Sequence, residues 1–240
     1  WGMLRFQHTQ AVRSALQEKY SAPTANKMLS ALRQTLHAAW NLGYMSADEY
    51  QRAIDLKPVI GEKPDAAFGR ALSYGEWAAL LNCCAGDQSA AGVRDAAMFA
   101  LFRIAGLRRA EMASLNVADY NLTNHMLTIR GKRNKTRVIP IEDPGAIGAL
   151  ADWLYLLVKQ EMEQETVQPL FTRILKGGKV TATRLTDQAI YYILDVRRQQ
   201  AGVAPFMPHD TRRTFAGDLL DAGVDLATVQ GLMGHTNANT

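Results

Sequence analysis

The sequence predicts a mainly α-helical protein that carries a small antiparallel β-sheet and folds as two domains. Three observations support this prediction: helical spacing of apolar residues near both ends of the chain, β-branched residues in one stretch around residues 126–139, and a stretch at residues 56–72 that has Pro, Gly and charges but no periodicity. We expect a first domain at residues 1–60, a linker at 61–72 and a second domain at 73–240.

The clearest element of the first domain is a helix within SAPTANKMLSALRQTLHAAWNLGYM, residues 21–45. Pro23 and Thr24 indicate its start, and Gly43 indicates its end. Lys27 and Arg33 lie opposite its apolar stripe, where they could meet a phosphate backbone or serve only as a solvated face. The i, i+3, i+4 spacing places the following residues on the stripe: Ala25, Met28, Leu29, Leu32, Leu36, Ala39 and Trp40.

The second domain is expected to open with three helices. Ser73 and Glu76 form an S-x-x-E capping box, which predicts a helix from residue 74. An apolar helix follows in AGVRDAAMFALFRIAG and ends at Gly106, and the next begins within LRRAEMASLNV, residues 107–117. Arg108 is therefore predicted at a buried corner between two helices, where its charge needs a partner.

Strands are expected next, and helices after them. The stretch HMLTIRGKRNKTRVIPI, residues 125–141, reads as two strands around a turn at residues 131–136. A third short strand is expected within GGKVTATRL, residues 177–185. Three further helices are expected, one capped by Thr186 and the others within residues 209–223 and 225–234.

Charge is concentrated in one part of the chain. The net charge is +4 and the sequence pI is about 9.1, which is only a mild bias. Between residues 103 and 137, however, eight Arg and Lys residues face only two acidic residues. Such a segment is typical of a face that binds a polyanion, although a solvated charged surface would read in the same way.

Composition indicates an intracellular protein. Hydrophobic residues make up 48% of the chain, but no apolar stretch reaches the roughly 20 residues that span a bilayer. Cys83 and Cys84 are adjacent, a spacing that suits neither a disulfide framework nor a C-x-x-C metal site. We expect a reducing, cytoplasmic setting without a membrane.

Two histidines and two arginines suggest a phosphate site. His209 and Arg212 are one helical turn apart, and His235 follows a glycine at the end of a later helix. Zinc would need three or four ligands with a close pair, and the nearest neighbours here are arginines, so we expect no metal. Arg108, Arg212 and Lys132 could instead neutralise a phosphodiester and the charge that develops on it during cleavage.

Four motifs occur in a fixed order: AGLRRAE, RGKRNKTRVIPI, PHDTRRTFA and LMGHTNANT. Together they resemble the tyrosine recombinase, or phage integrase, family. The likeness covers almost the whole chain, because residues 24–45 are also similar to that family's helical core-binding module. The resemblance implies a DNA-binding core-binding domain at residues 1–60 and a catalytic domain at residues 73–240.

The resemblance also assigns roles to the matching residues. Arg108, which follows Gly-Leu, and Arg212 would bind the scissile phosphate, and Glu111 would support Arg108. Arg213 replaces a histidine frequent in the family and is expected outside the site.

The other assigned residues would donate a proton or a hydrogen bond. Lys132 would be the general acid, and His209 and His235 would contact the phosphate. Four further basic residues are candidates for contacts with the DNA backbone: Lys27, Arg33, Arg133 and Lys135.

The family's nucleophile is a tyrosine shortly after G-H-T. None of the tyrosines in the sequence occupies that place, because Thr240 precedes it. We expect the sequence to be trimmed before this tyrosine, and also at its start, or a tail to be missing from it, rather than a natural loss of the residue.

The predicted activity is site-specific recombination through a 3′-phosphotyrosine link, as in integration of a mobile element. Excision, resolution of chromosome dimers and cassette movement are equally open roles. The resemblance implies a double-stranded recombination site, a tetramer in the synaptic complex (a monomer or dimer otherwise), a bacterial or phage source, and no metal or cofactor. Two alternatives remain open: a type IB topoisomerase-like enzyme that nicks and reseals one duplex, and a DNA-binding accessory protein that has lost catalysis.

Overall fold

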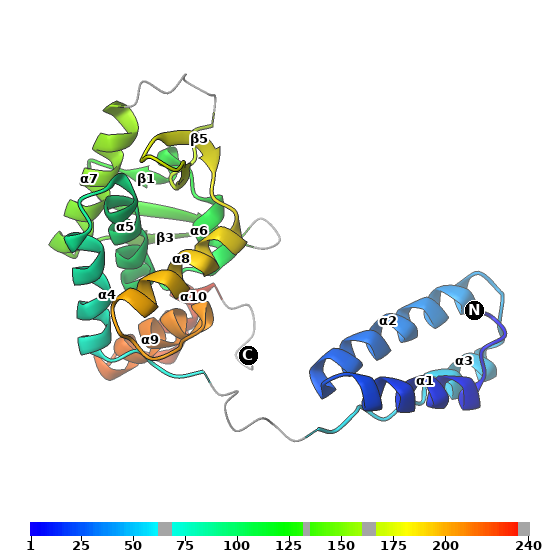
Figure 1. Cartoon of the computed structure of the whole chain (residues 1–240). Helices are drawn as coiled ribbons and strands as arrows, with labels where there is room; N and C mark the ends of the chain where they lie inside the picture. The colour runs from blue at the N-terminus through cyan, green and yellow to red at the C-terminus, as the bar shows by residue number, and fades with distance from the viewer. Residues whose placement is uncertain (62–68, 132–134, 160–166, 235–240) are drawn as a thin grey trace. The chain divides into compact units, whose positions relative to one another are not determined.

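The computed structural model describes the chain except residues 62–68, 132–134, 160–166 and 235–240 (Figure 1). The chain divides into two compact units, Trp1–Ala67 and Phe68–Thr240. Both are built mainly from helices, and the second also contains small antiparallel sheets, so the predicted fold class is confirmed. None of the helices in the described ranges is both long and apolar enough to cross a bilayer.

The first unit consists of α1 (Phe6–Lys19), α2 (Ala22–Asn41) and α3 (Ala47–Ile54). Most of the stripe predicted on α2 is buried against the other two helices. Met28 and Trp40 were also predicted to be buried, but they are 38% and 37% exposed. They border the stripe, and Trp40 stacks flat on Tyr50 of α3 with ring centroids 5.0 Å apart.

The second unit has a helical core centred on α5 (Ala90–Ala105). This helix packs against α4 (Tyr74–Gly86), α7 (Pro144–Lys159) and α9 (Pro208–Asp221) (Figure 1). The predicted capping box is present, because the Ser73 Oγ accepts the Glu76 N–H, and Glu76 Oε2 accepts the Ser73 N–H. The other helices of this unit are α6 (Arg109–Ser114), the 3₁₀ turn η1 (Val117–Asp119), α8 (Asp187–Gln200) and α10 (Leu226–Met233).

Two small sheets flank this core. The first has the order β1 (Tyr120–Asn121), β2 (Met126–Arg130), β3 (Thr136–Pro140), all antiparallel. The second pairs β4 (Thr172–Ile174) with β5 (Val180–Arg184). The predicted hairpin and the predicted third strand are therefore confirmed, but that strand, β5, belongs to a separate sheet.

The sequence did not predict β1, β4 or α7. β1 has only two residues, too few for an alternating pattern. α7 was missed although its buried residues follow the i, i+3, i+4 spacing that predicts a helix: Ala146, Leu150, Trp153, Leu154 and Leu157.

A buried network of charges joins α5, α8 and β4. Asp95 accepts hydrogen bonds from Arg94 Nη2 at 2.7 Å and from Arg197 Nε at 2.8 Å. Arg197 also pairs with Asp87 at 2.6 Å, and Arg94 donates to the Thr172 carbonyl. Asp95, Arg94 and Arg197 are each at most 6% exposed, so each charge depends on its partners.

We expect Asp95→Ala to lower the free energy of unfolding of the second unit by about 3–5 kcal/mol, because it leaves two arginines buried without their shared carboxylate. Urea denaturation measures this change. The exposed Asp152 of α7 is the matched control, and Asp152→Ala should stay within about 0.5 kcal/mol. Equal effects of the two substitutions would contradict the role given to the network.

Candidate active site

The site begins where α5 ends. Gly106 adopts a left-handed conformation with φ 52°, and a Cβ there would collide with the Phe215 ring of α9. The chain then turns through the buried Leu107 into α6, with Arg108 as the residue before its first turn. This tight corner brings the start of α6 and the body of α9 together.

Glu111 in the first turn of α6 holds Arg108 in place. Its Oε2 accepts the Arg108 backbone N–H at 2.9 Å, and its Oε1 accepts Arg108 Nη1 at 2.7 Å. The partner that the sequence required for Arg108 is therefore present. The prediction that Arg108 is buried was wrong, because 38% of its side chain is exposed where α6 begins at the surface.

Arg137 of β3 binds the same carboxylate through two parallel hydrogen bonds. Arg137 Nη1 and Nη2 donate to Glu111 Oε1 and Oε2 at 3.1 and 2.8 Å. Burial alone would raise the pKa of Glu111, but the hydrogen bonds from Arg137 and from the Arg108 N–H lower it to about 2. Glu111 is only 6% exposed and therefore remains a charged, fixed anchor for two arginines.

Arg212 of α9 is anchored by carbonyls alone. Its Nη1 donates to the Gly106 carbonyl at 2.7 Å, and its Nη2 donates to the carbonyl of Met233, the last residue of α10. The side chain is 1% exposed, and its Nε has no hydrogen-bond partner among the described residues. Burial, together with the nearby positive charge of Arg108, lowers the pKa of Arg212 to about 10, so it stays protonated at neutral pH.

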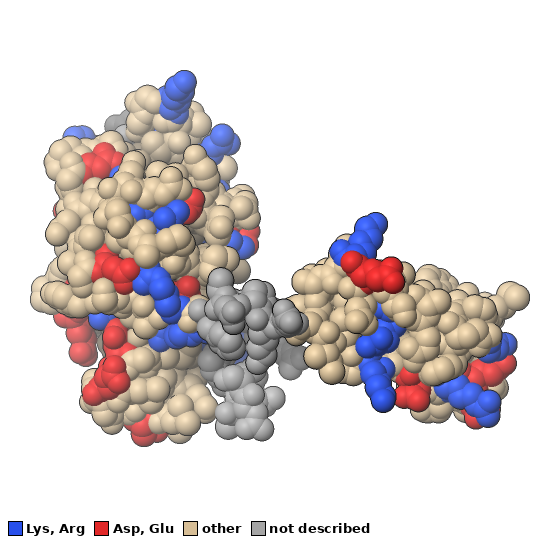
Figure 2. Space-filling view, turned by 60° about the horizontal axis from the view of Figure 1, so that its bottom comes forward, with Lys and Arg blue, Asp and Glu red and all other residues tan. Residues whose placement is uncertain are grey.

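Positive charge is therefore in excess at this place. Among the described residues of the cluster, three guanidinium groups, those of Arg108, Arg137 and Arg212, face one carboxylate, that of Glu111. Basic and acidic side chains are intermixed on the face shown in Figure 2. The feature that distinguishes the site is thus this partly buried excess charge, which would favour a bound anion.

His209 lies in the first turn of α9, one turn before Arg212, and its side chain is exposed. The i, i+3 spacing puts the two on one side of the helix. Arg213 points to Asp210, 3.3 Å away, rather than into the cluster.

Lys132 and His235 lie outside the described residues, but each follows a glycine that is described. A Cβ on Gly131 would lie 3.8 Å from Glu111 Oε1, and a Cβ on Gly234 would lie 3.2 Å from Arg137 Nη1. The structure thus brings the residues that precede both candidates to the Glu111–Arg137 pair.

The candidates for DNA backbone contacts have different surroundings. Lys27 on α2 and Lys135 before β3 are exposed. Arg33 is half-buried and donates to the Leu56 carbonyl at 2.6 Å within the first unit. Arg133 lies outside the described residues.

The sequence interpretation missed Arg137 as a site residue. In β3 it shares a face with the buried Ile139, two residues further on, and it pairs in register with Ile129. An arginine at an inward-facing strand position needs a charged partner, and this signal could have identified it. No group of three metal-binding His, Cys, Asp or Glu side chains is found within the described ranges.

Comparison with known proteins shows clear relatives. Residues 71–240 match the phage integrase family. The tyrosine recombinase XerC of Corynebacterium glutamicum is 30% identical over 232 residues, which span 94% of this chain and 68% of that protein. XerC of Natranaerobius thermophilus is 27% identical over 245 residues, spanning 100% of this chain and 77% of that protein.

The chain also resembles solved structures. The post-cleavage complex of XerH site-specific recombinase with a palindromic difH substrate superposes with a TM-score of 0.77 at 18% identity. The match covers 99% of this chain and 67% of that one. At this identity the likeness concerns the fold.

The low pKa of Glu111 predicts a loss of stability in acid. A carboxyl whose folded pKa of about 2 lies below its ordinary 4.5 stabilises the fold fully above pH 4.5, and this contribution disappears as the pH falls towards 2. Between pH 6 and pH 3, Glu111→Gln should therefore lose less unfolding free energy than the unaltered chain, by about 2 kcal/mol. Urea denaturation at both pH values measures the difference.

The exposed Glu142 provides the control for this experiment. Glu142→Gln should follow the pH dependence of the unaltered chain. If Glu111→Gln also follows it, the carboxylate does not hold the arginines as described.

Proposed function

The chain belongs to the phage integrase family of tyrosine recombinases, and we propose that it cuts and rejoins DNA at a specific site through a 3′-phosphotyrosine intermediate. The observation that carries the proposal is the excess of guanidinium groups around Glu111. A phosphodiester supplies the missing negative charge, and cleavage adds more of it in the transition state. The DNA-bound state of structural neighbours such as XerH supports a DNA substrate.

Arg108 and Arg212 would bind the non-bridging oxygens of the scissile phosphate. Arg212 uses one N–H on each Nη for a carbonyl, which leaves the second hydrogen of each and the buried Nε–H. Arg108 is held on one side by Glu111 and is open on the other. Both arginines are thus fixed before the substrate arrives, and such preorganisation lowers the cost of binding the transition state.

The remaining steps follow the family's chemistry. The tyrosine, which the resemblance places after Thr240, attacks phosphorus in line; its oxygen forms a new P–O bond while the bond to the 5′ oxygen breaks. Lys132 donates a proton to that 5′ oxygen, and His209 and His235 donate hydrogen bonds to the phosphate. Attack by the 5′ hydroxyl of a partner strand reverses the step and releases the tyrosine.

We further propose that the first unit is the core-binding domain. It would contact the DNA backbone through Lys27 and Arg33, while Arg133 and Lys135 would contact it from the catalytic domain. Strand exchange between two duplexes needs four active sites, so the functional assembly would be a tetramer at the recombination site. The proposed reaction needs neither a metal nor a cofactor. We also propose that the protein acts in the cytoplasm.

Covalent capture tests the proposal. A chain carried past Thr240 through the tyrosine is mixed with a nicked duplex selected for binding, without metal, and a DNA adduct that survives boiling in detergent is measured. Arg212→Ala should lower adduct formation about 100-fold or more, since it removes a preorganised donor, while duplex affinity changes little. Arg52→Ala on the surface of α3, where Arg52 pairs with Asp48, is the control.

The outcomes separate the candidate functions. Full adduct formation by Arg212→Ala would remove this arginine from the mechanism. An unaltered chain that binds the duplex but forms no adduct would be an accessory DNA-binding protein. Adduct formation with relaxation of supercoiled DNA, but without pairing of two duplexes, would indicate a type IB topoisomerase-like enzyme.

A further inference from the structure

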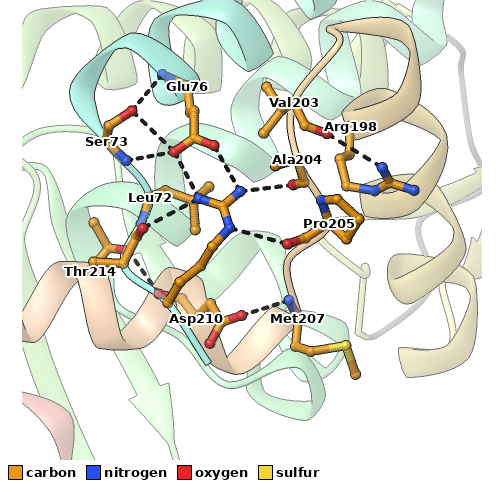
Figure 3. A network of polar contacts seen from close by, with 12 residues as sticks. Leu72, Ser73, Glu76, Arg198, Val203, Ala204, Pro205, Met207, Asp210 and Thr214 are labelled. Atoms are coloured by element: carbon orange, nitrogen blue, oxygen red, sulfur yellow. Dashed lines mark hydrogen bonds and ion pairs between the residues drawn. The ribbon is translucent and has the colours of Figure 1, made fainter. Parts of the chain in front are cut away.

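The chain enters the second unit directly over α9, the helix that carries His209 and Arg212. Figure 3 shows Leu72 and Ser73 beside Thr214 and Asp210 of this helix. The Leu72 backbone N–H donates to Thr214 Oγ1 at 2.8 Å in a buried contact, and Thr214 Oγ1 donates to the Asp210 carbonyl at 2.8 Å. The last residues of the predicted linker therefore lie against the first two turns of α9.

Arg70 is the centre of a denser set of contacts at the same place. Its Nε donates to the Pro205 carbonyl at 3.1 Å, and its Nη2 donates to the Ala204 carbonyl at 2.8 Å. Both oxygens of Glu76 lie 2.8 Å from its Nη atoms. One guanidinium thus joins the start of α4 to the connection between α8 and α9.

That connection has few backbone hydrogen bonds with which to fix its own course. Pro205 and Pro208 have no N–H, and residues 203–207 form no helix or strand. The Val203 carbonyl accepts Arg198 Nη1 at 3.3 Å, so the next two carbonyls depend on Arg70. Figure 3 shows Ala204, Pro205 and Met207, through which the chain enters α9. Arg70 joins this turn to Glu76 at the start of α4.

Glu76 keeps Arg70 in this position. Its hydrogen bond with Arg70 and its bonds with Ser73 lower the pKa of Glu76 to about 2, although burial opposes the shift. The same carboxylate closes the capping box of α4, so it is fixed from both sides. The guanidinium of Arg70 is thus bound by a carboxylate that is itself held in place at the start of α4.

The contacts with residues 69–72 use a face of α9 that adjoins the one carrying His209 and Arg212. Asp210, Arg213 and Thr214 follow i, i+3, i+4 spacing and meet the entering chain. A Cβ on Gly69 would collide with the ends of the Asp210 and Arg213 side chains. His209 and Arg212 lie one turn apart on the adjoining face, and Arg212 belongs to the arginine cluster.

We propose that Arg70 is a positioning residue for DNA cleavage, which fixes the first turns of α9 from the end of the linker and so sets the places of His209 and Arg212. The inference rests on the proposed function. Arg70 lies outside the four sequence motifs. The proposal therefore gives a part in cleavage to the segment through which the chain enters the second unit. It also makes the placement of α9 sensitive to the path of the chain at residues 69–72.

Single-turnover adduct formation at saturating nicked duplex tests this, using the chain carried through the tyrosine. Arg70→Ala should slow the adduct step about tenfold or more and change duplex affinity less than about threefold, because no proposed DNA contact is removed. Amide hydrogen exchange should rise in residues 203–212 and stay unchanged in α5 and α7. Arg70→Lys should restore only part of the rate, since an ammonium cannot reproduce the planar fork that joins Glu76 to two carbonyls.

The first unit offers a matched control. Arg5 pairs with Glu49 at 2.7 Å, donates to the Gly2 and Leu4 carbonyls, and Glu49 closes a capping box with Ser46. Arg5→Ala removes a similar set of bonds away from α9 and should leave the adduct rate at saturating DNA within about twofold of that of the unaltered chain.

A second variant keeps the proposal testable if Arg70→Ala fails to fold. Gly69→Ala retains every donor of Arg70 but pushes Asp210, whose Oδ2 accepts the Met207 N–H at 2.8 Å. It should slow the adduct step and raise exchange in residues 207–212. A normal rate in both variants, or increased exchange throughout the second unit, would overturn the proposal. If the unaltered chain forms no adduct, the proposed function fails, whereas the exchange result still reports on Arg70.

Discussion

The carboxylate of Glu111 is the constraint on which the candidate site depends. It is buried, it stays ionised, and it binds Arg108 from its own helix and Arg137 from the neighbouring sheet. Arg212, held by carbonyls, adds a third positive charge nearby. One carboxylate cannot neutralise three guanidinium groups, and this imbalance distinguishes the site from the Arg94–Asp95–Arg197–Asp87 network, where two acids meet two bases.

The fold supplies the geometry that keeps these charges together. The left-handed turn at Gly106 frees a carbonyl for Arg212, and the end of α10 supplies another. β2 lies beside α6, and β3 lies beside α10. The hairpin therefore contacts both the helix that carries Glu111 and the helix whose last carbonyl binds Arg212. Arg70 binds the Ala204 and Pro205 carbonyls in the connection that leads into α9. Each arginine is thus positioned by backbone or by another charge before any ligand binds.

Short-range sequence patterns predicted part of the fold and part of the site. The Ser73–Glu76 capping box and the hairpin each span a few residues, so their local sequence patterns predict them. Arg137 reaches Glu111 across 26 residues, and Arg70 reaches Pro205 across 135, distances over which no spacing rule operates. The exposure of Arg108 likewise depends on where α6 meets the surface. The resemblance named Arg108 and Arg212, with Glu111 as the support of Arg108, but it named neither Arg137 nor the carbonyls that hold Arg212.

The central claim is that the excess positive charge of the cluster compensates the charge of a scissile phosphate. The most direct measurement compares adduct formation on a duplex with an ordinary phosphate and on one with a neutral methylphosphonate at the cleaved position, with Arg212 and with Arg212→Ala. If the claim holds, the substitution causes a large loss on the charged phosphate and a much smaller loss on the neutral one. An equal loss on both would show that Arg212 acts through structure rather than through charge.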